Sequence, residues 1–235
     1  MQALSRLRTV SESGSILGIV VGILVFGSVW GFVEATLGGA LHLIHFTYKG
    51  AITGGIAMAI MAAFVVTYRR PKLVFWLGVI AALFKPLSAA IYGQPIFSPF
   101  VVNPASAILL EALGFTVVVS LLFKGFESSI KTRIAVGISA GYLSAILYAI
   151  LASALGMGRW ASWGLTERVT GALADGTGLA IVGTALLLLG YLVTAKLRPN
   201  FWQFMTVKPK TFYASGVAIT VFCWIGAAVA FASGL

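Results

Sequence analysis

The sequence predicts an all-α fold, a polytopic bundle of membrane-spanning helices, and three observations support this prediction. Of its 235 residues, 60% are hydrophobic and only 9% are charged, whereas soluble domains carry about 25% charged residues. Apolar runs long enough to cross about 30 Å of hydrocarbon recur along the chain. Within lipid, long runs of this kind favour helices over strands, because a helix satisfies its backbone amides internally. We therefore expect a single integral membrane domain, residues 1–235, with seven spans.

Each expected span has the 19 to 24 residues that a helix rising about 1.5 Å per residue needs to cross a bilayer. The first follows Arg6 and Arg8, a pattern that secretory signals share. However, its uncharged run lasts from Ser13 to Val33 and no Ala-x-Ala cleavage site closes it, so we expect an uncleaved span. The seven spans, in order, are Ser15–Val33, Gly50–Tyr68, Leu73–Tyr92, Asn103–Phe123, Ile134–Met157, Gly176–Ala195 and Thr211 to about Gly234.

The loops between these spans indicate the orientation, because cytoplasmic loops are enriched in Lys and Arg. Cations gather in alternate loops: Arg6 and Arg8, then Arg69, Arg70 and Lys72, then Lys124, Lys131 and Arg133, then Lys196, Arg198, Lys208 and Lys210. The other loops hold only Lys49, Arg159 and Arg168. We expect a cytoplasmic N-terminus, an external C-terminus and a multi-pass protein of a prokaryotic cytoplasmic (inner) membrane. The formal charge of +10 is then accounted for by topology and anionic lipid, not by nucleic acid.

A short motif occurs twice with the same spacing and suggests an internal repeat. Trp30-Gly31-x-x-Glu34-x-x-x-Gly38 recurs as Trp163-Gly164-x-x-Glu167-x-x-x-Gly171. The possible halves are residues 13–92 and 134–235, with a linker helix at 103–123, and both would enter the membrane in the same direction. Chance matching is the alternative. This three-plus-one-plus-three plan resembles, in architecture, the SWEET sugar carriers and the bacterial nicotinamide-riboside permeases.

Two ionisable residues fall inside predicted spans, where such side chains are costly and are therefore candidates for function. Lys85 lies in the third span, about two-thirds of the way out, and Glu111 lies in the fourth, about eight residues from its outer end. We expect them to approach each other in the outer half of the membrane, as a binding site or as an internal ion pair. Pro86 removes a backbone hydrogen bond next to Lys85 and favours a kink.

Glu34, His42 and His45 form a second group near the outer end of the first span. His42 and His45 are three residues apart and would share one face of a helix, where both could reach one metal ion. Glu34 is about 16 Å from His45 along a continuous helix, and could join them only if Gly38 and Gly39 break it. The alternative is a pair of solvated interfacial histidines. Cys223 is the only cysteine, which excludes a multi-cysteine metal site, and no cofactor can be named.

Glu167, Arg168 and Asp175 are expected in an outer loop. They are either simply solvated or, if the repeat is real, Glu167 is the counterpart of Glu34 at an outward-facing vestibule. Gly137-x-Ser139-x-Gly141 has the spacing of a nucleophile elbow, but it lies in an apolar helix away from both histidines. We read it as a helix-packing pattern, like Gly18-x-x-x-Gly22, Gly27-x-x-x-Gly31 and Gly50-x-x-x-Gly54. We expect no enzyme.

The size of the chain, its glycine-rich first two spans, Lys85-Pro86, and the stretch from Asn103-Pro104 to Glu111 resemble the substrate-binding S component of energy-coupling-factor transporters. The resemblance covers about the first 125 residues. It implies that a vitamin or other small nutrient binds on the outside, and that a separate ATP-driven module on the cytoplasmic side powers uptake.

Two classes of function follow. The first is a membrane transport protein, or the substrate-binding subunit of an uptake system, with Glu34, Lys85, Glu111 and Glu167 around a small solute. The second is a non-catalytic anchor or structural subunit of a larger respiratory or photosynthetic membrane complex. A transporter predicts a cavity lined by Lys85 and Glu111. An anchor predicts internal pairing of these residues and an apolar face covered by other membrane subunits.

Overall fold

The computed structural model describes residues 15–235, and within them seven helices are long and apolar enough to cross a membrane. The spans are α2 (Ile16–Leu43), α3 (Lys49–Tyr68), the segment Pro71–Tyr92, α6 (Pro99–Leu121), α8 (Ile130–Ala154), α9 (Leu165–Val207) and α10 (Pro209–Ala232). The described part of the chain contains no strand. The predicted all-α fold is confirmed, and the chain is a multi-pass membrane protein. Arg6 and Arg8 lie outside the described residues.

The third span is made of three consecutive helical pieces. A short 3₁₀ turn, η1 (Pro71–Leu73), leads into α4 (Val74–Ala82), and α5 (Phe84–Tyr92) follows after Leu83. Pro86 has no amide hydrogen for the carbonyl of Ala82, so the regular hydrogen-bond pattern is interrupted where α4 ends. The expected irregularity next to Lys85 is therefore present, as a break between two helices.

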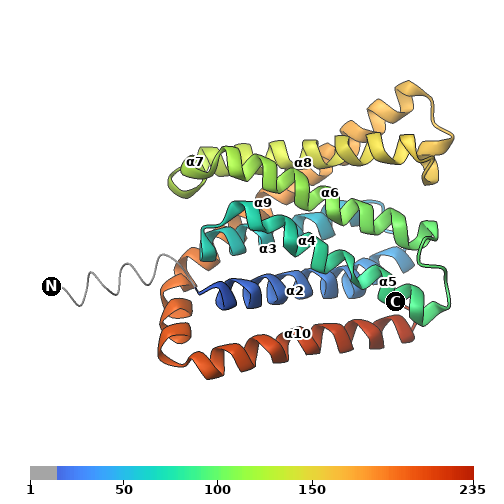
Figure 1. Cartoon of the computed structure of the whole chain (residues 1–235). Helices are drawn as coiled ribbons and strands as arrows, with labels where there is room; N and C mark the ends of the chain where they lie inside the picture. Colours follow the sequence, from blue (N-terminus) through green and yellow to red (C-terminus); the bar gives the residue numbers. More distant parts are fainter. Residues whose placement is uncertain (1–14) are drawn as a thin grey trace.

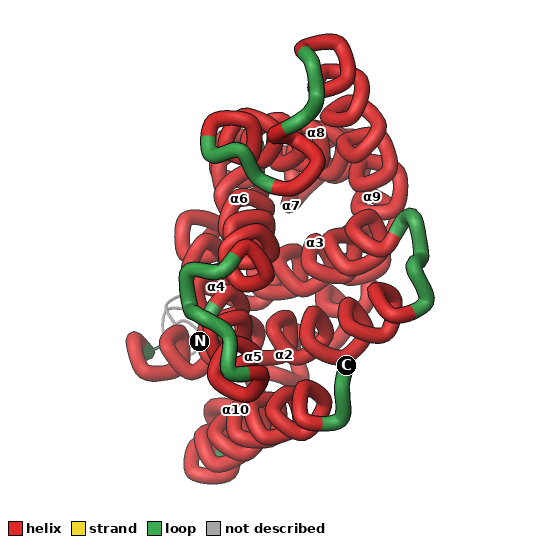
Figure 2. The backbone as a smooth tube through the Cα atoms, turned by 90° about the vertical axis from the view of Figure 1, so that its right-hand side faces the viewer, coloured by secondary structure: helices red, strands yellow, loops and turns green. Residues whose placement is uncertain are grey.

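Six spans form a ring and the seventh lies outside it. Around the ring, α2 packs against α3, α3 against α9, α9 against α8, α8 against α6, α6 against α4, and α4 against α2. Viewed nearly along the helix axes, α10 lies beside α2 at the edge of the bundle (Figure 2). The largest core cluster lies inside this ring and includes Trp30, Phe64, Leu77 and Phe115, all fully buried.

Glycines let neighbouring helices approach closely, as the sequence predicted. A Cβ added at Gly141 would lie 2.8 Å from the backbone nitrogen of Ala180 on α9, and one at Gly27 would lie 2.9 Å from the carbonyl oxygen of Leu77 on α4. Gly137 faces Thr184 in the same manner. Gly50 is different, because a Cβ there would meet nothing within 4 Å. The Gly137-x-Ser139-x-Gly141 pattern is thus a helix contact between α8 and α9.

Several helices begin or end where local chemistry requires it. Ser15 caps α2, its side-chain oxygen accepting the amide of Gly18 at 3.1 Å. Pro99 and Pro209 occupy first-turn positions of α6 and α10, where a missing amide costs nothing. Gly93 ends α5 with a φ of 63°, a conformation that glycine adopts without strain.

Two helices are much longer than predicted. α2 runs through Gly38 and Gly39 to Leu43, so these glycines do not break the helix and the condition for Glu34 to join the histidines is not met. α9 has 43 residues, about 65 Å at 1.5 Å per residue. It includes Glu167, Arg168 and Asp175, which were expected in a loop, and it continues through Pro199. Beyond Pro199 its last turns cross the end of the bundle to reach α10 (Figure 1).

The connections between the spans lie at two opposite ends. The α3–α4, α6–α8 and α9–α10 connections share the end on the left of Figure 1, and the short helix α7 (Phe123–Ser128) lies there too. We call it the basic end, because it carries Arg69, Arg70, Lys72, Lys124, Lys131, Arg133, Lys196, Arg198, Lys208 and Lys210. The C-terminus lies at the opposite end (Figure 1).

Candidate functional site

Two ionisable side chains at membrane depth, Lys85 and Glu111, each lie within electrostatic range of Glu34 on a third helix. Glu34 is on α2, Lys85 on the first turn of α5, and Glu111 on α6. Because α6 begins at Pro99, Glu111 lies about 18 Å from its first residue and about 15 Å from its last, nearer the middle of the span than expected. All three residues are half-buried.

Glu34 is the residue that links the group. Its carboxyl interacts electrostatically with both Lys85 and Glu111. Neither Lys85 nor Glu111 takes part in an ion pair within 4.0 Å; in residues 15–235 such pairs join Arg69 to Glu127 and Arg159 to Asp175. The direct Lys85–Glu111 pair that we considered from the sequence is therefore absent. The two helices are not locked together by a salt bridge at this point.

Glu111 has a polar atom that nothing in the described chain satisfies. Its Oε2 is buried and has no hydrogen-bond partner. Such an atom costs free energy that a bound donor could recover. The indole nitrogen of Trp30, on the turn of α2 before Glu34, is also buried without a partner. Trp30 packs over Gly78 of α4, next to the α6 turn that precedes Glu111.

Small residues of α3 and α2 provide space beside the two carboxyl groups. A Cβ added at Gly54 of α3 would lie 2.9 Å from Oε1 of Glu111. One added at Gly38 of α2 would lie 3.4 Å from Oε2 of Glu34 and 3.7 Å from the methyl carbon of Thr53. Thr53 is buried. The sequence did not identify Thr53 as part of this region, and it marked Gly54 only as a packing residue.

The break before α5 positions Lys85. Phe84 is fully buried, where its ring lies over Gly31 of α2 and its centroid is 4.3 Å from that of Trp224 on α10. On the other side of Lys85, Ser88 donates a hydrogen bond of 2.7 Å to the Lys85 carbonyl. Phe84 thus holds the first turn of α5 against α2 and α10, whereas the Ser88 hydrogen bond is internal to α5.

The two histidines do not share a helix face. α2 ends at Leu43, so His42 is in its last turn whereas His45 lies beyond it with a φ of 53°. Nδ1 of His42 is 2.6 Å from Nζ of Lys49, an ammonium that competes with a metal for that nitrogen. Among the described residues, no group of three or more His, Cys, Asp and Glu side chains gathers in one place. The His42–His45 metal site remains a prediction for which the structure adds no third ligand.

Glu167 has a local structural role. Its Oε2 accepts the backbone amide of Gly164 at 2.7 Å and so satisfies one free amide at the start of α9. The two copies of the Trp-Gly-x-x-Glu motif consequently differ in local structure. The first lies in the middle of α2, whereas the second spans a loop and the first turns of α9. No interaction connects Glu167 to Glu34, Lys85 or Glu111 in the described structure.

Two small, open cavities in the described part of the chain are lined by other residues than Glu34, Lys85 and Glu111. One, of about 260 Å³, lies at the basic end between α3, α7 and α9. The other, of about 330 Å³, is an apolar groove between α2 and α3 lined by Val25, Phe26, Val29, Ala59, Ile60 and Ala63. No protein-family model matches the chain, and no curated protein or solved structure matches it.

Proposed function

We propose that this membrane protein is a transport protein, or the substrate-binding subunit of an uptake system, which captures a small polar solute from the side opposite its basic end. The observation that supports the proposal is the group of Glu34, Lys85 and Glu111 at membrane depth, with no ion pair joining its members and with one carboxyl oxygen unpaired. Ionisable groups in spans are expensive, and those that face a bundle interior often mark solute pathways.

The charges of Glu34, Lys85 and Glu111 favour a solute that carries a positive charge. Two carboxyl groups and one ammonium group offer more acceptors for a cation than for an anion. A solute with an amino group could interact with Glu34 and Glu111, and a carboxylate or carbonyl on the same molecule could accept a hydrogen bond from Lys85. We therefore propose a cationic or zwitterionic solute, within the class of small nutrients that the family resemblance implies.

The orientation follows from the loop charges. Cytoplasmic loops are enriched in Lys and Arg, so the basic end would face the cytoplasm. The surface there would also be the contact site for a separate ATP-driven module, if the resemblance to energy-coupling-factor S components extends to their mode of action. A carrier that works alone would need no such module.

Lys85→Leu tests the site. We expect the purified wild-type chain to retain a small molecule of defined mass in native mass spectrometry, and Lys85→Leu to lose it. Lys131→Leu is the matched control, because it removes the same charge at an exposed position of the basic end. It should retain the molecule.

Two results would contradict the proposal. The first is a Lys85→Leu protein that is more stable than the wild type and still retains the same molecule. The second is a wild-type chain that retains nothing and whose unfolding temperature no member of a panel of amino acids, vitamins and small cations raises.

One observation favours the alternative of a structural subunit. The groove between α2 and α3 is lined only by apolar side chains, and two of its six lining residues, Ala59 and Ala63, are alanines. Small residues let a transmembrane helix approach closely. A helix of another subunit seated there, identified by cross-linking from Ala59 in native membranes, would support the structural role.

A further inference from the structure

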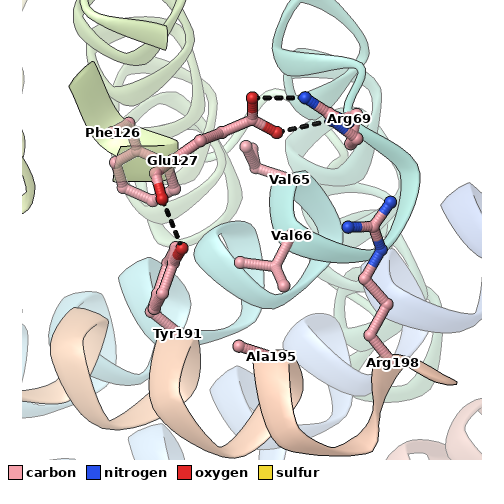
Figure 3. Close-up of a pocket in the computed structure, with 8 residues that line it drawn as sticks. All are labelled: Val65, Val66, Arg69, Phe126, Glu127, Tyr191, Ala195 and Arg198. Atoms are coloured by element: carbon pink, nitrogen blue, oxygen red, sulfur yellow. Dashed lines mark hydrogen bonds and ion pairs between the residues drawn. The ribbon is translucent and has the colours of Figure 1, made fainter. Parts of the chain in front are cut away.

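The cavity at the basic end lies between three helices and has charged walls. It is lined by Val65, Val66, Arg69, Phe126, Glu127, Tyr191, Ala195 and Arg198. Arg69 directly follows the last residue of α3, Glu127 is on α7, and Arg198 is on α9. In Figure 3, the Arg69 and Arg198 side chains are on the same side of the cavity, with Glu127 opposite.

A hydrogen-bond network fixes the α7 wall. Tyr191 of α9 donates its hydroxyl to the Glu127 carbonyl at 2.9 Å, and Arg133 of α8 donates to the same carbonyl at 2.8 Å. The Arg133 guanidinium also lies 3.6 Å from the centre of the Tyr191 ring. The Glu127 carboxylate pairs with the Arg69 guanidinium through two contacts, Nε to Oε1 at 2.5 Å and Nη2 to Oε2 at 2.6 Å. These interactions fix the walls of the cavity relative to one another.

Arg198 carries a hydrogen-bond donor for which the described structure shows no acceptor. Its Nε is buried and has no hydrogen-bond partner, and it takes part in neither ion pair of the described residues. One helical turn further along α9, the indole nitrogen of Trp202 is also a buried donor without an acceptor. Residues four apart lie on the same face of a helix. Two unsatisfied donors thus occupy one face of α9 at the basic end.

We propose that this cavity binds a phosphate group, with Arg198 as its main ligand and with the charge of Arg69 in support. A guanidinium presents a planar set of N–H donors that matches phosphate oxygens. With two arginines and one carboxylate, the walls carry a net positive charge. A volume of about 260 Å³ exceeds that of a phosphate, so the ester group that carries it also has room.

The phosphate could belong to an anionic lipid or to a soluble phosphoester, since the basic end lies at a membrane surface where anionic headgroups collect. The chemistry of recognition is the same for both. This site is separate from the group of Glu34, Lys85 and Glu111, and it does not depend on the function proposed for that group.

Binding to the purified full-length protein would test the proposal. One arm titrates glycerol phosphate into protein in neutral detergent. The other compares nanodiscs of phosphatidylcholine alone with nanodiscs that contain phosphatidic acid, with bound lipid counted by native mass spectrometry. We expect saturable binding in at least one arm, weakened at least tenfold by Arg198→Gln and within twofold of the wild type in Lys196→Gln. The control removes the same charge two residues away, at an exposed position.

The arm that responds identifies the source of the phosphate. Equal losses in Arg198→Gln and Lys196→Gln would overturn the proposal, because binding would then reflect the net charge of the basic end. A folded wild-type protein that binds neither probe saturably would overturn it as well. Arg198→Lys keeps the charge but not the planar donor set, and we expect it to recover only part of the affinity.

Discussion

Glu111 and Glu167 are the same residue type in opposite surroundings. Glu111 is in the middle of α6 with a buried oxygen that has no partner, and the carboxyl of Glu34 is a nearby like-charged group. Glu167 is exposed and its carboxyl accepts the amide of Gly164. One side chain therefore costs stability and the other contributes to it.

Replacing each with leucine should change stability in opposite directions. Glu111→Leu should stabilise the chain by about 1 to 3 kcal/mol, because it removes a buried polar atom without a partner. Glu167→Leu should destabilise it by about 0.5 to 1 kcal/mol, because the amide of Gly164 loses its acceptor. Reversible unfolding in mixed micelles would measure both. Destabilisation by Glu111→Leu would mean that its carboxyl makes a favourable interaction that the structure does not contain.

For individual residues, the sequence was more informative about which side chains are candidates for a site than about how those side chains interact. Placing charges in apolar runs identified Lys85 and Glu111, since few other ionisable groups lie at membrane depth. It grouped Glu34 with them around one solute but placed it beyond the first span, which was predicted to end at Val33, whereas α2 continues to Leu43. Arg198 was counted only as a loop cation. The missing partner of its Nε is visible only when α3, α7 and α9 are packed together.

Contacts between α9 and α3 show how glycine position determines helix spacing. A Cβ at Gly190 would lie 2.6 Å from the carbonyl oxygen and 2.9 Å from the Cα of Ala59, which are backbone atoms that cannot rotate away. A Cβ at Gly178, on the same helix and also facing α3, would meet only the Cβ of Ala51, at 3.4 Å. The second distance is an ordinary van der Waals contact.

Gly190→Ala should therefore lower the free energy of unfolding by about 1 to 3 kcal/mol, the usual cost of overpacking, because the two helices must separate. Gly178→Ala should be neutral, or raise it by about 0.5 to 1 kcal/mol through the better helix propensity of alanine. Unfolding of both variants in the same detergent would provide the comparison. Equal effects would show that α3 and α9 do not touch closely at Gly190.

The sequence predicted the number and order of the elements well and their ends poorly. Apolar run length identified all seven spans, since the bilayer sets that length. It could not identify helical residues outside the hydrocarbon, so it missed the first turns of α9 and its continuation through Pro199. Proline at position 86 correctly indicated an irregular third span, because its missing amide acts locally.

For the whole molecule, an odd number of spans puts the start of α2 and the end of α10 on opposite sides of the membrane. The basic end should face the cytoplasm and the C-terminus the outside. The single cysteine, Cys223, is 3% exposed and can be replaced with alanine to make a cysteine-free background.

In that background, Ser233→Cys should react with a membrane-impermeant maleimide on intact cells, and Ser129→Cys should react only after permeabilisation. Ser129 lies between α7 and α8 at the basic end, and Ser233 follows α10 at the other. The reverse pattern would invert the proposed orientation. Labelling of both from outside would contradict the seven-span topology.

The separation of α5 from α4 has a mechanical consequence for Lys85. α5 has nine residues and packs mainly on α10 and α6, while α4 belongs to the ring of six helices. Leu83, the residue that joins the two helices, keeps helical backbone angles, with a φ of −65° and a ψ of −15°, so the chain continues in nearly the same direction. The first turn of α5 contacts α10 through Phe84 and Trp224, and Phe84 also lies against Gly31 of α2. Because Phe84 precedes Lys85, a displacement of α10 relative to α2 would have to repack Phe84 and would shift the Lys85 backbone with it.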